Sequence, residues 1–92
     1  MNRPQDNQWN VSVDREAVSN LQRLPEDERI RILRALDKLS GGPFQPGSRR
    51  LHGRPEWRFR VGARRALFLV DFDSKTILVT DIGSRGDVYK HD

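Results

Sequence analysis

The sequence has no cysteine, one methionine and one tyrosine among its 92 residues. Without cysteine the chain can form neither a disulfide nor a thiolate metal site, which is typical of proteins from a reducing compartment. Residues 1–8 (MNRPQDNQ) lack the apolar segment of a signal peptide, and no apolar run reaches membrane-spanning length. The two histidines, His52 and His91, are not at metal-ligand spacing in the sequence. We therefore expect a cytoplasmic protein with no membrane association, no metal and no cofactor.

Positive charge is concentrated in one stretch of the chain. Residues 49–65 contain seven of the fourteen arginines and a single acid, Glu56, so this stretch carries a formal charge of +6. Because the whole chain carries +4, the remainder sums to −2. A guanidinium binds phosphate through a planar fork of donors, so the stretch favours an anionic partner such as RNA, DNA or an acidic protein segment. The alternative is a solvated surface that serves solubility alone.

The pattern within this stretch predicts a strand. Trp57, Phe59 and Val61 alternate with Arg58 and Arg60. An alternation of period two places one set of side chains in the core and the other on the opposite face of a sheet. We therefore expect the aromatic rings to be buried and the two guanidinium groups to lie side by side on the other face.

The residues that follow predict a hairpin. Gly62 and Ala63 form a turn, and residues 64–72 are mostly apolar, as in an adjacent antiparallel strand. Arg65 lies near the start of that strand, where we expect it to reach solvent or a ligand. The alternative is a structural ion pair of Arg65 with Asp71 or Asp81.

The remaining segments predict two helices and two further strands. Residues 9–13 alternate as a strand, and Asp14 follows as the N-cap of a helix. Pro25 ends this helix and suits the start of a second one over residues 26–39. Residues 76–82 are β-branched and mainly apolar, as in a last strand.

Two segments between these elements are more polar. Residues 44–55 show little periodicity and predict a long loop. Four basic residues of the second helix are expected to form a solvated face, paired with acids one turn away; they are Arg29, Arg31, Arg34 and Lys38.

The order β-α-α-β-β-β predicts an α+β fold, with a helical hairpin packed on a small antiparallel sheet. Residues 1–8 are expected to be a flexible tail and residues 9–92 a single domain.

This order and four sequence segments resemble the RelE/ParE superfamily of toxins from type II toxin–antitoxin systems. The segments are residues 21–25 (LQRLP), 51–53 (LHG), 57–65 (WRFRVGARR) and 82–89 (IGSRGDVY). The resemblance covers the chain from Trp9 to Tyr89. It implies a RelE-like fold and a cognate antitoxin, with which the toxin would form a hetero-oligomer. RelE-type members cut mRNA in the A site of the 70S ribosome, whereas ParE-type members inhibit DNA gyrase.

The resemblance also implies site residues. The catalytic candidates are Arg58, Arg60, Arg65, Arg85 and Tyr89. The basic residues expected to bind RNA around them are Arg49, Arg50, Arg54, Arg64 and Lys90. In this scheme Arg65 binds the scissile phosphate, and Arg85 binds phosphate or protonates the leaving group. Arg58 and Arg60 hold the RNA backbone beside the 2′-OH, and Tyr89 stacks on a base or hydrogen-bonds the nucleotide.

The sequence departs from the family pattern at three points. Arg64 replaces the tyrosine before the turn arginine, arginines replace the lysines of the basic pair, and Val88 replaces a histidine found in some relatives.

Cleavage of RNA without a metal also needs a proton acceptor. Arginine stays protonated at neutral pH and suits that task poorly. Glu56, His52, His91 and the substrate itself remain open. The expected function is a ribosome-dependent, metal-independent endoribonuclease. The alternatives are a ParE-like gyrase inhibitor and a binding module that has lost activity.

Overall fold

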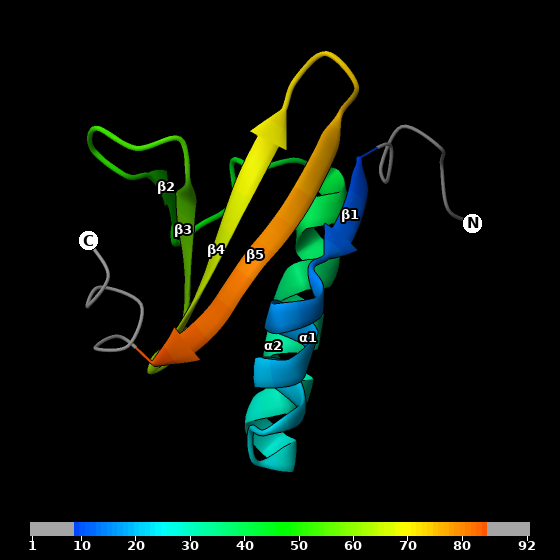
Figure 1. Cartoon of the computed structure of the whole chain (residues 1–92), viewed down its shortest axis with the longest axis vertical. Coiled ribbons are helices and arrows are strands. Elements are labelled where there is room, and N and C mark those ends of the chain that lie inside the picture. The colour runs from blue at the N-terminus through cyan, green and yellow to red at the C-terminus, as the bar shows by residue number, and fades with distance from the viewer. Residues whose placement is uncertain (1–8, 85–92) are drawn as a thin grey trace.

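The computed structural model describes residues 9–84, which form one helical hairpin and one sheet (Figure 1). The elements are β1 (Asn10–Val13), α1 (Arg15–Gln22), α2 (Glu26–Lys38), the 3-10 helix η2 (Leu39–Gly41), β2 (Ser48–Arg50), β3 (Trp57–Val61), β4 (Arg64–Asp71) and β5 (Thr76–Ser84). The strands are ordered β1-β5-β4-β3-β2 in a single five-stranded sheet. The predicted α+β fold is confirmed. None of the described helices is long and apolar enough to span a membrane.

The sheet is mixed rather than purely antiparallel, because β1 lies parallel to β5. Asn10 lies opposite Thr76, and Val13 lies opposite Val79. A hairpin turn forces two strands to be antiparallel, but a crossover leaves the parallel arrangement available. β1 is separated from the other strands by two helices, so no hairpin constrains its direction. The other three strand pairs are antiparallel. Two of them, β3 with β4 and β4 with β5, were predicted, whereas β2 was not.

The segment predicted as a long loop contains a short strand, β2. Its three residues pair with β3, and Arg49 lies opposite Arg58. Two of the three are arginines, so the strand has no apolar alternation by which it could be detected. This pairing adds one strand to the side of the sheet that carries the arginines.

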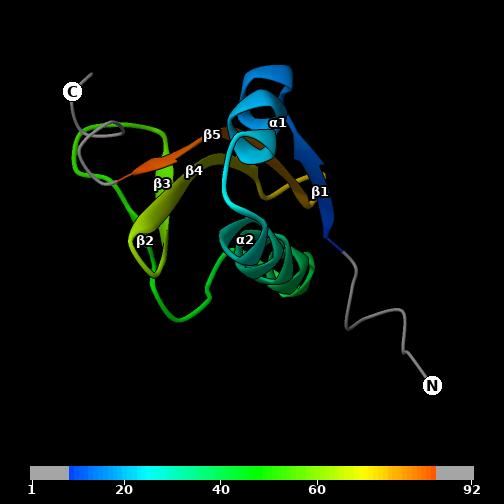
Figure 2. The same ribbon diagram turned by 90° about the horizontal axis from the view of Figure 1, so that it is seen from below.

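The core lies between the sheet and the helices. Seen from below in Figure 2, α2 lies against one face of the sheet and α1 lies beside β1 and β5. Trp57 and Phe59 are buried in this core, as their alternation predicts. The largest fully buried side chains are Phe68, Ile32, Leu39, Ile77, Ile82, Val79 and Pro43. The face of β3 that carries the arginines is therefore the one turned away from α2.

The predicted helix start is also observed. The Asp14 carboxylate accepts a hydrogen bond from the backbone N–H of Arg15 at 2.7 Å and caps α1. The expectation for α2 is wrong in one respect. Among residues 9–84, none of its basic residues Arg29, Arg31, Arg34 and Lys38 forms an ion pair with an acid one turn away. Arg29 instead donates to the Leu24 carbonyl oxygen at 3.3 Å.

The turn between β4 and β5 is held by the carboxylate of Asp71. It accepts hydrogen bonds from the backbone N–H groups of Asp73 at 3.0 Å and Ser74 at 3.3 Å. The bonds from Ser74, and to a lesser extent from Asp73, lower the pKa of Asp71 below its usual value. A lowered carboxyl pKa means that this stabilisation is present at neutral pH and is lost as the pH falls through the folded-state pKa.

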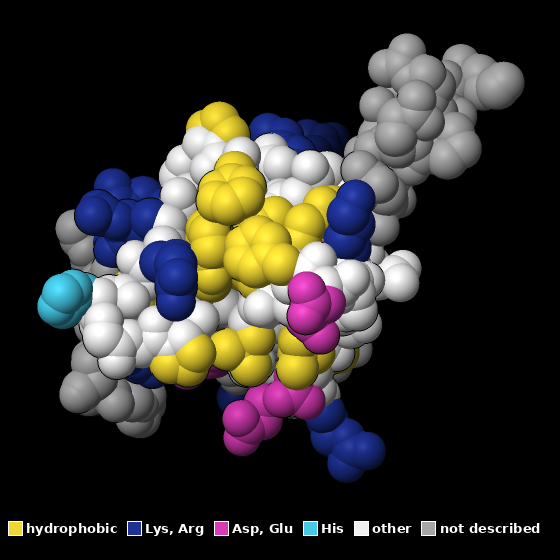
Figure 3. Space-filling view, turned by 90° about the horizontal axis from the view of Figure 1, so that it is seen from above, with side chains coloured by type: hydrophobic (Ala, Val, Ile, Leu, Met, Phe, Trp, Pro, Cys, Tyr) yellow, Lys and Arg dark blue, Asp and Glu magenta, His cyan; other side chains and the backbone are white. Residues whose placement is uncertain are grey.

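Aromatic side chains gather at the end of the molecule that holds this turn. The ring of Trp9 lies edge-on to Phe72, with 5.7 Å between centroids, and Phe44 lies 5.4 Å from Trp57. Phe44 is 74 % exposed and Phe72 is 51 % exposed. Figure 3 shows hydrophobic side chains at the centre of this end, with charged side chains around them. Trp57 stacks on Phe68 at 5.9 Å, so the cluster continues the core to the surface.

Two phenylalanines of β4 and its turn allow the core to be tested. We expect Phe68→Ala to lower the free energy of unfolding by about 3–5 kcal/mol, because Phe68 is fully buried and its loss leaves a cavity. Phe72→Ala is the matched control and should cost about 1 kcal/mol or less, because half of the ring is already in water. Urea unfolding followed by circular dichroism measures both. Equal losses would show that the exposed cluster contributes to stability as much as the core does.

Candidate functional site

The sheet face turned away from α2 carries a group of arginines on adjacent strands. In the register between β3 and β4, Arg58 lies opposite Leu67 and Arg60 lies opposite Arg65. Residues directly opposite in a sheet point to the same side, so these side chains share one face. Arg49 joins them, since it lies opposite Arg58 on β2. The structure therefore brings together four of the arginines that the sequence singles out.

This face is hollowed beside β2 and β3. A hollow of about 780 Å³ is lined by Arg49, Arg50, Leu51, His52, Gly53, Arg54, Pro55 and Arg58. A second hollow, of about 340 Å³, is lined by Gly47, Ser48, Arg49, Arg58 and Arg60. Arg49 and Arg58 line both, so we treat the two as one surface, the arginine groove, defined by Arg49, Arg50, Arg54, Arg58 and Arg60. No acid is among the lining residues, and such a one-signed surface attracts phosphate.

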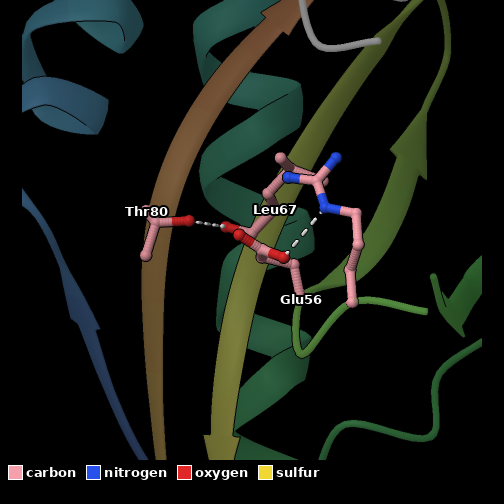
Figure 4. Close-up of polar contacts among 4 residues, drawn as sticks. Glu56, Leu67 and Thr80 are labelled. Atoms are coloured by element: carbon pink, nitrogen blue, oxygen red, sulfur yellow. Dashed lines mark hydrogen bonds and ion pairs between the residues drawn. The ribbon is translucent and has the colours of Figure 1, made fainter. Parts of the chain in front are cut away.

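One acid lies beside this groove. The Glu56 Oε1 atom is 3.2 Å from Nε of Arg54, and both side chains are about three-quarters buried, with 25 % and 30 % of their surface exposed. Figure 4 shows this ion pair together with the hydrogen bond from Thr80 Oγ1 to the Leu67 carbonyl oxygen, 3.4 Å long. The backbone N–H of Leu51 donates to the Glu56 carbonyl oxygen at 3.0 Å and closes the loop. Glu56 is thus held in a defined place at the rim of the groove.

Arg65 is buried, contrary to the expectation that it reaches solvent. Only 3 % of its surface is exposed. It lies in the middle of three strands, opposite Arg60 on β3 and opposite Gly83 on β5. A place near the start of a strand therefore does not expose the side chain here. The alternative of an ion pair with Asp71 or Asp81 is not observed among residues 9–84, where Asp81 accepts a hydrogen bond from Asn20 at 3.0 Å.

Arg64 is separated from the other arginines. It lies opposite Val61, on the side of the sheet that faces α2. Its Nε atom is 2.6 Å from Oε1 of Glu28, in the first turn of α2. This ion pair joins β4 to the helix, so the structure does not bring Arg64 into the arginine groove.

Three predicted site residues lie outside the described part of the chain, and their roles stay predictions. They are Arg85, Tyr89 and Lys90; His91, one of the proposed proton acceptors, also lies there. The last described residue of β5, Ser84, lies opposite Arg64.

The contribution of β2 to the site was not predicted from the sequence. Gly47 adopts a φ of +89°, and an added Cβ would lie 3.3 Å from the carbonyl oxygen of Arg60. The backbone N–H of Arg60 donates to the Gly47 carbonyl oxygen at 3.0 Å. A Pro-Gly pair is a turn signal, so Pro46 and Gly47 could have indicated that the chain turns into an edge strand there.

Several solved structures are similar to this chain. No protein-family model and no curated protein sequence matches the chain. A chain of the archaeal RelE–RelB complex from Pyrococcus horikoshii OT3 is similar, with a TM-score of 0.75 and 26 % identity, over 85 % of this chain and 96 % of that one.

Two further structures have the same fold. A chain of the Mycobacterium tuberculosis toxin–antitoxin complex RelBE2 has a TM-score of 0.73 and 20 % identity, over 84 % of this chain and 98 % of that one. The isolated E. coli RelE toxin has a TM-score of 0.71 and 18 % identity, over 90 % of this chain and 93 % of that one.

The placement of Arg58 and Arg64 on opposite sides of the sheet predicts different responses to salt. Arg58→Gln should weaken the binding of a single-stranded RNA and reduce the slope of log affinity against log salt by about 0.7, because one phosphate contact is lost. Arg64→Gln removes the same charge away from the groove and should leave the slope unchanged. Fluorescence anisotropy across a salt series measures both slopes. Equal changes would mean that RNA responds to net charge rather than to the groove.

Proposed function

We propose that this chain, which has the fold of the RelE toxins, is the toxin of a type II toxin–antitoxin system. We further propose that it acts as a ribosome-dependent endoribonuclease that cuts mRNA in the A site and so inhibits translation in the cytoplasm. The observation that carries the proposal is the arginine groove, which is lined by five arginines and by no acid.

The chemistry follows from what guanidinium groups can stabilise. Attack of the 2′-OH on the adjacent phosphate forms a phosphorane with additional negative charge. Cations already fixed near that charge lower the barrier, because they need no reorganisation during the reaction. In the proposed mechanism Arg58 and Arg60 bind the RNA backbone beside the 2′-OH, where their charges act on the developing phosphorane.

Arg65 has a different part in this mechanism. Its charge lies in the buried layer opposite Arg60. An ion removed from water interacts more strongly with a nearby charge than an exposed one does. Arg65 would therefore stabilise the phosphorane from beneath the exposed pair, with Arg85 and Tyr89 completing the site from the segment that follows β5.

A proton acceptor is still needed for the 2′-OH. Two groups of the described chain can serve: Glu56, which is fixed by Arg54, and His52, which is exposed in the lining of the larger hollow. Glu56 is the better positioned of the two because its ion pair limits its motion. The ribosome would supply the in-line geometry of the substrate by ordering the mRNA.

The proposed regulator is a cognate antitoxin. The Pyrococcus structure is a RelE–RelB complex, and the Mycobacterium structure is a toxin–antitoxin complex. A groove of one charge sign binds an acidic segment of a partner as readily as it binds RNA. We propose that the antitoxin and this chain form a hetero-oligomer in which acidic side chains occupy the arginine groove.

A second candidate is a ParE-like toxin that inhibits DNA gyrase without cutting RNA. The observation that favours it is Arg64, which stands where the resemblance implies a tyrosine and which is bound to Glu28 on the other side of the sheet. One experiment separates the candidates: the chain is expressed in a bacterial host, and mRNA 5′ ends and gyrase-linked DNA breaks are mapped in the same cells. New mRNA ends without DNA breaks support the nuclease, and the reverse supports the gyrase inhibitor.

Arg60, an exposed arginine of β3, allows the proposed catalysis to be tested without disturbing the core. Arg60→Ala should lower the rate of mRNA cleavage on programmed ribosomes by about 10²–10³, because a cation aimed at the phosphorane is lost. Its melting temperature should stay close to that of the wild type, since the side chain is exposed. Arg15→Ala, at an exposed position of α1, is the matched control and should cut at the wild-type rate. Equal rates for all three proteins would remove Arg60 from the mechanism.

Arg65 needs a different variant because it is buried. Arg65→Ala should both unfold more easily, by about 1–3 kcal/mol, and lose activity, so loss of activity alone would not be informative. Arg65→Lys keeps the charge and loses the planar fork. We expect it to fold, as judged by circular dichroism, and to cut more slowly than the wild type but faster than Arg65→Ala. A folded Arg65→Lys with the wild-type rate would show that charge alone matters at this position.

A further inference from the structure

The most exposed large apolar side chain of residues 9–84 is Phe44, which lies between η2 and β2. It is 74 % exposed, although its ring contacts the rings of Trp57 and Phe72 at centroid distances of 5.4 Å and 6.0 Å. The contact with Trp57 is edge-on, with 73° between the ring planes. Trp57 is buried and stacks on Phe68, so it belongs to the core. The ring of Phe44 is therefore supported by the core on one side and open to solvent on the other.

The backbone around Phe44 is fixed on both sides. Pro43 is fully buried, and its carbonyl oxygen accepts hydrogen bonds from the backbone N–H of Gln45 at 3.1 Å and from Ser48 Oγ at 2.7 Å. The backbone N–H of Ser48 donates in turn to the Gln45 carbonyl oxygen at 2.9 Å. A ring on a segment that is already ordered loses little conformational entropy when it binds a ligand.

Positive charge lies on the β2 side of this ring. Arg50 lies opposite Trp57 in the register between β2 and β3, so it starts on the face of the sheet that carries the aromatic rings. Arg49 lies opposite Arg58 and starts on the other face. Arg49 and Arg50 are exposed, and neither takes part in an ion pair found among residues 9–84. The two arginines thus connect the arginine groove to the aromatic rings across the edge strand β2.

The side of the aromatic cluster away from β2 carries acids. Asp71 and Asp73 flank Phe72 in the turn between β4 and β5, and both are exposed. Figure 3 shows Lys and Arg side chains to the left of the hydrophobic cluster, whereas both signs of charge occur to its right and below it. A polyanion would therefore approach the rings from β2 and cover Phe44 rather than Phe72.

The size of the exposed aromatic surface indicates what kind of ligand fits it. A phenylalanine offers about 200 Å² of side-chain surface, so the exposed parts of Phe44 and Phe72 amount to about 250 Å². A specific protein partner buries about 800 Å² on each side, of which more than half is apolar. A nucleobase needs only one open ring face, and every base has a π-face to stack on it. The arginines beside the ring bind the phosphates that such a strand carries.

We propose that Phe44 is a stacking platform for an unpaired base of a single-stranded RNA whose phosphates lie in the arginine groove. The inference rests on the proposed function, in which RNA occupies that groove, and it adds a base subsite beyond the edge of the sheet. The strand would cross the sheet edge at β2, with phosphates on Arg49 and Arg50. Stacking of this kind strengthens binding with little dependence on base sequence.

The test measures the binding of a fluorescein-labelled RNA of about eight adenosines to the whole chain by anisotropy. The RNA carries 2′-O-methyl groups, so it cannot be cut. A second probe has the same sugar-phosphate backbone without bases and reports charge alone. The variants are Phe44→Ala, Phe44→Leu and Phe44→Trp. Phe72→Ala is the matched control, because it removes the same ring from the side that carries the acids. Circular dichroism checks folding, which we expect to be retained because both rings are at least half in water.

We expect Phe44→Ala to bind the adenosine probe about tenfold more weakly than the wild type, as for the loss of one stacked base. Phe44→Leu should lose most of this affinity as well, because leucine keeps apolar surface but has no π-face. Phe44→Trp should bind as tightly as the wild type, and Phe72→Ala should change the affinity by less than about twofold. The backbone probe should bind all variants equally. The salt slope of Phe44→Ala should equal that of the wild type, because no phosphate contact is lost.

Equal affinity of the wild type and Phe44→Ala for the adenosine probe would overturn the inference. So would equal losses in Phe44→Ala and Phe72→Ala, or an equal loss for the backbone probe. A wild type that sediments as a dimer and a Phe44→Ala variant that sediments as a monomer would also overturn it, because a second copy of the chain would then cover the ring.

These outcomes are separate from the fate of the proposed function. The mapping of mRNA 5′ ends decides that function with the wild-type chain and needs no change at Phe44. A wild type that binds the adenosine probe through Phe44 yet produces no new mRNA ends would leave the base subsite standing and remove the nuclease assignment.

Discussion

The antiparallel register between β3 and β4 is the constraint on which the site depends. It places Phe59 opposite Ala66 on the core side and Arg60 opposite Arg65 on the other side. Because side chains alternate with a period of two, a slip of one residue would turn the guanidinium groups into the core and the aromatic rings into water. The burial of Trp57 and Phe59 makes such a slip costly. The energy that fixes the core therefore also fixes where the arginines point.

The arginine groove lowers the stability of the folded state, and the other interactions of the fold have to offset this loss. Five arginines line the groove, and within residues 9–84 only one of them, Arg54, forms an ion pair with an acid. Their like charges repel one another, and salt or a bound polyanion relieves that repulsion. Where the structure does pair an arginine with an acid, the pair is structural: Arg64 with Glu28 joins a strand to a helix, and Arg54 with Glu56 orders a loop. Arg64 thus serves the fold alone, whereas Arg54 also lines the arginine groove.

Much of this arrangement follows from local sequence, and the exceptions have physical causes. The alternation from Trp57 to Val61 and the cap at Asp14 depend on near neighbours, so the sequence predicts them correctly. The direction of β1 depends on a crossover through two helices, so the residues of β1 alone do not indicate whether it is parallel or antiparallel to β5. β2 is too short and too polar to show a period. Arg65 lies between Arg60 of β3 and Gly83 of β5, and the residues around Arg65 in the sequence do not indicate these neighbours.

The strand order has a consequence for how the protein is made. β5 lies between β1 and β4, and it contributes the fully buried Ile77, Val79 and Ile82 to the core. The sheet therefore joins the first described strand to the last. Until β5 is present, β1 has no partner strand and β4 is paired only with β3. Chains emerge from the ribosome N-terminus first, and non-local pairings form only after both segments are available. The nascent chain consequently cannot complete its fold, or the arginine surface that the fold presents, until β5 has left the ribosome that is making it.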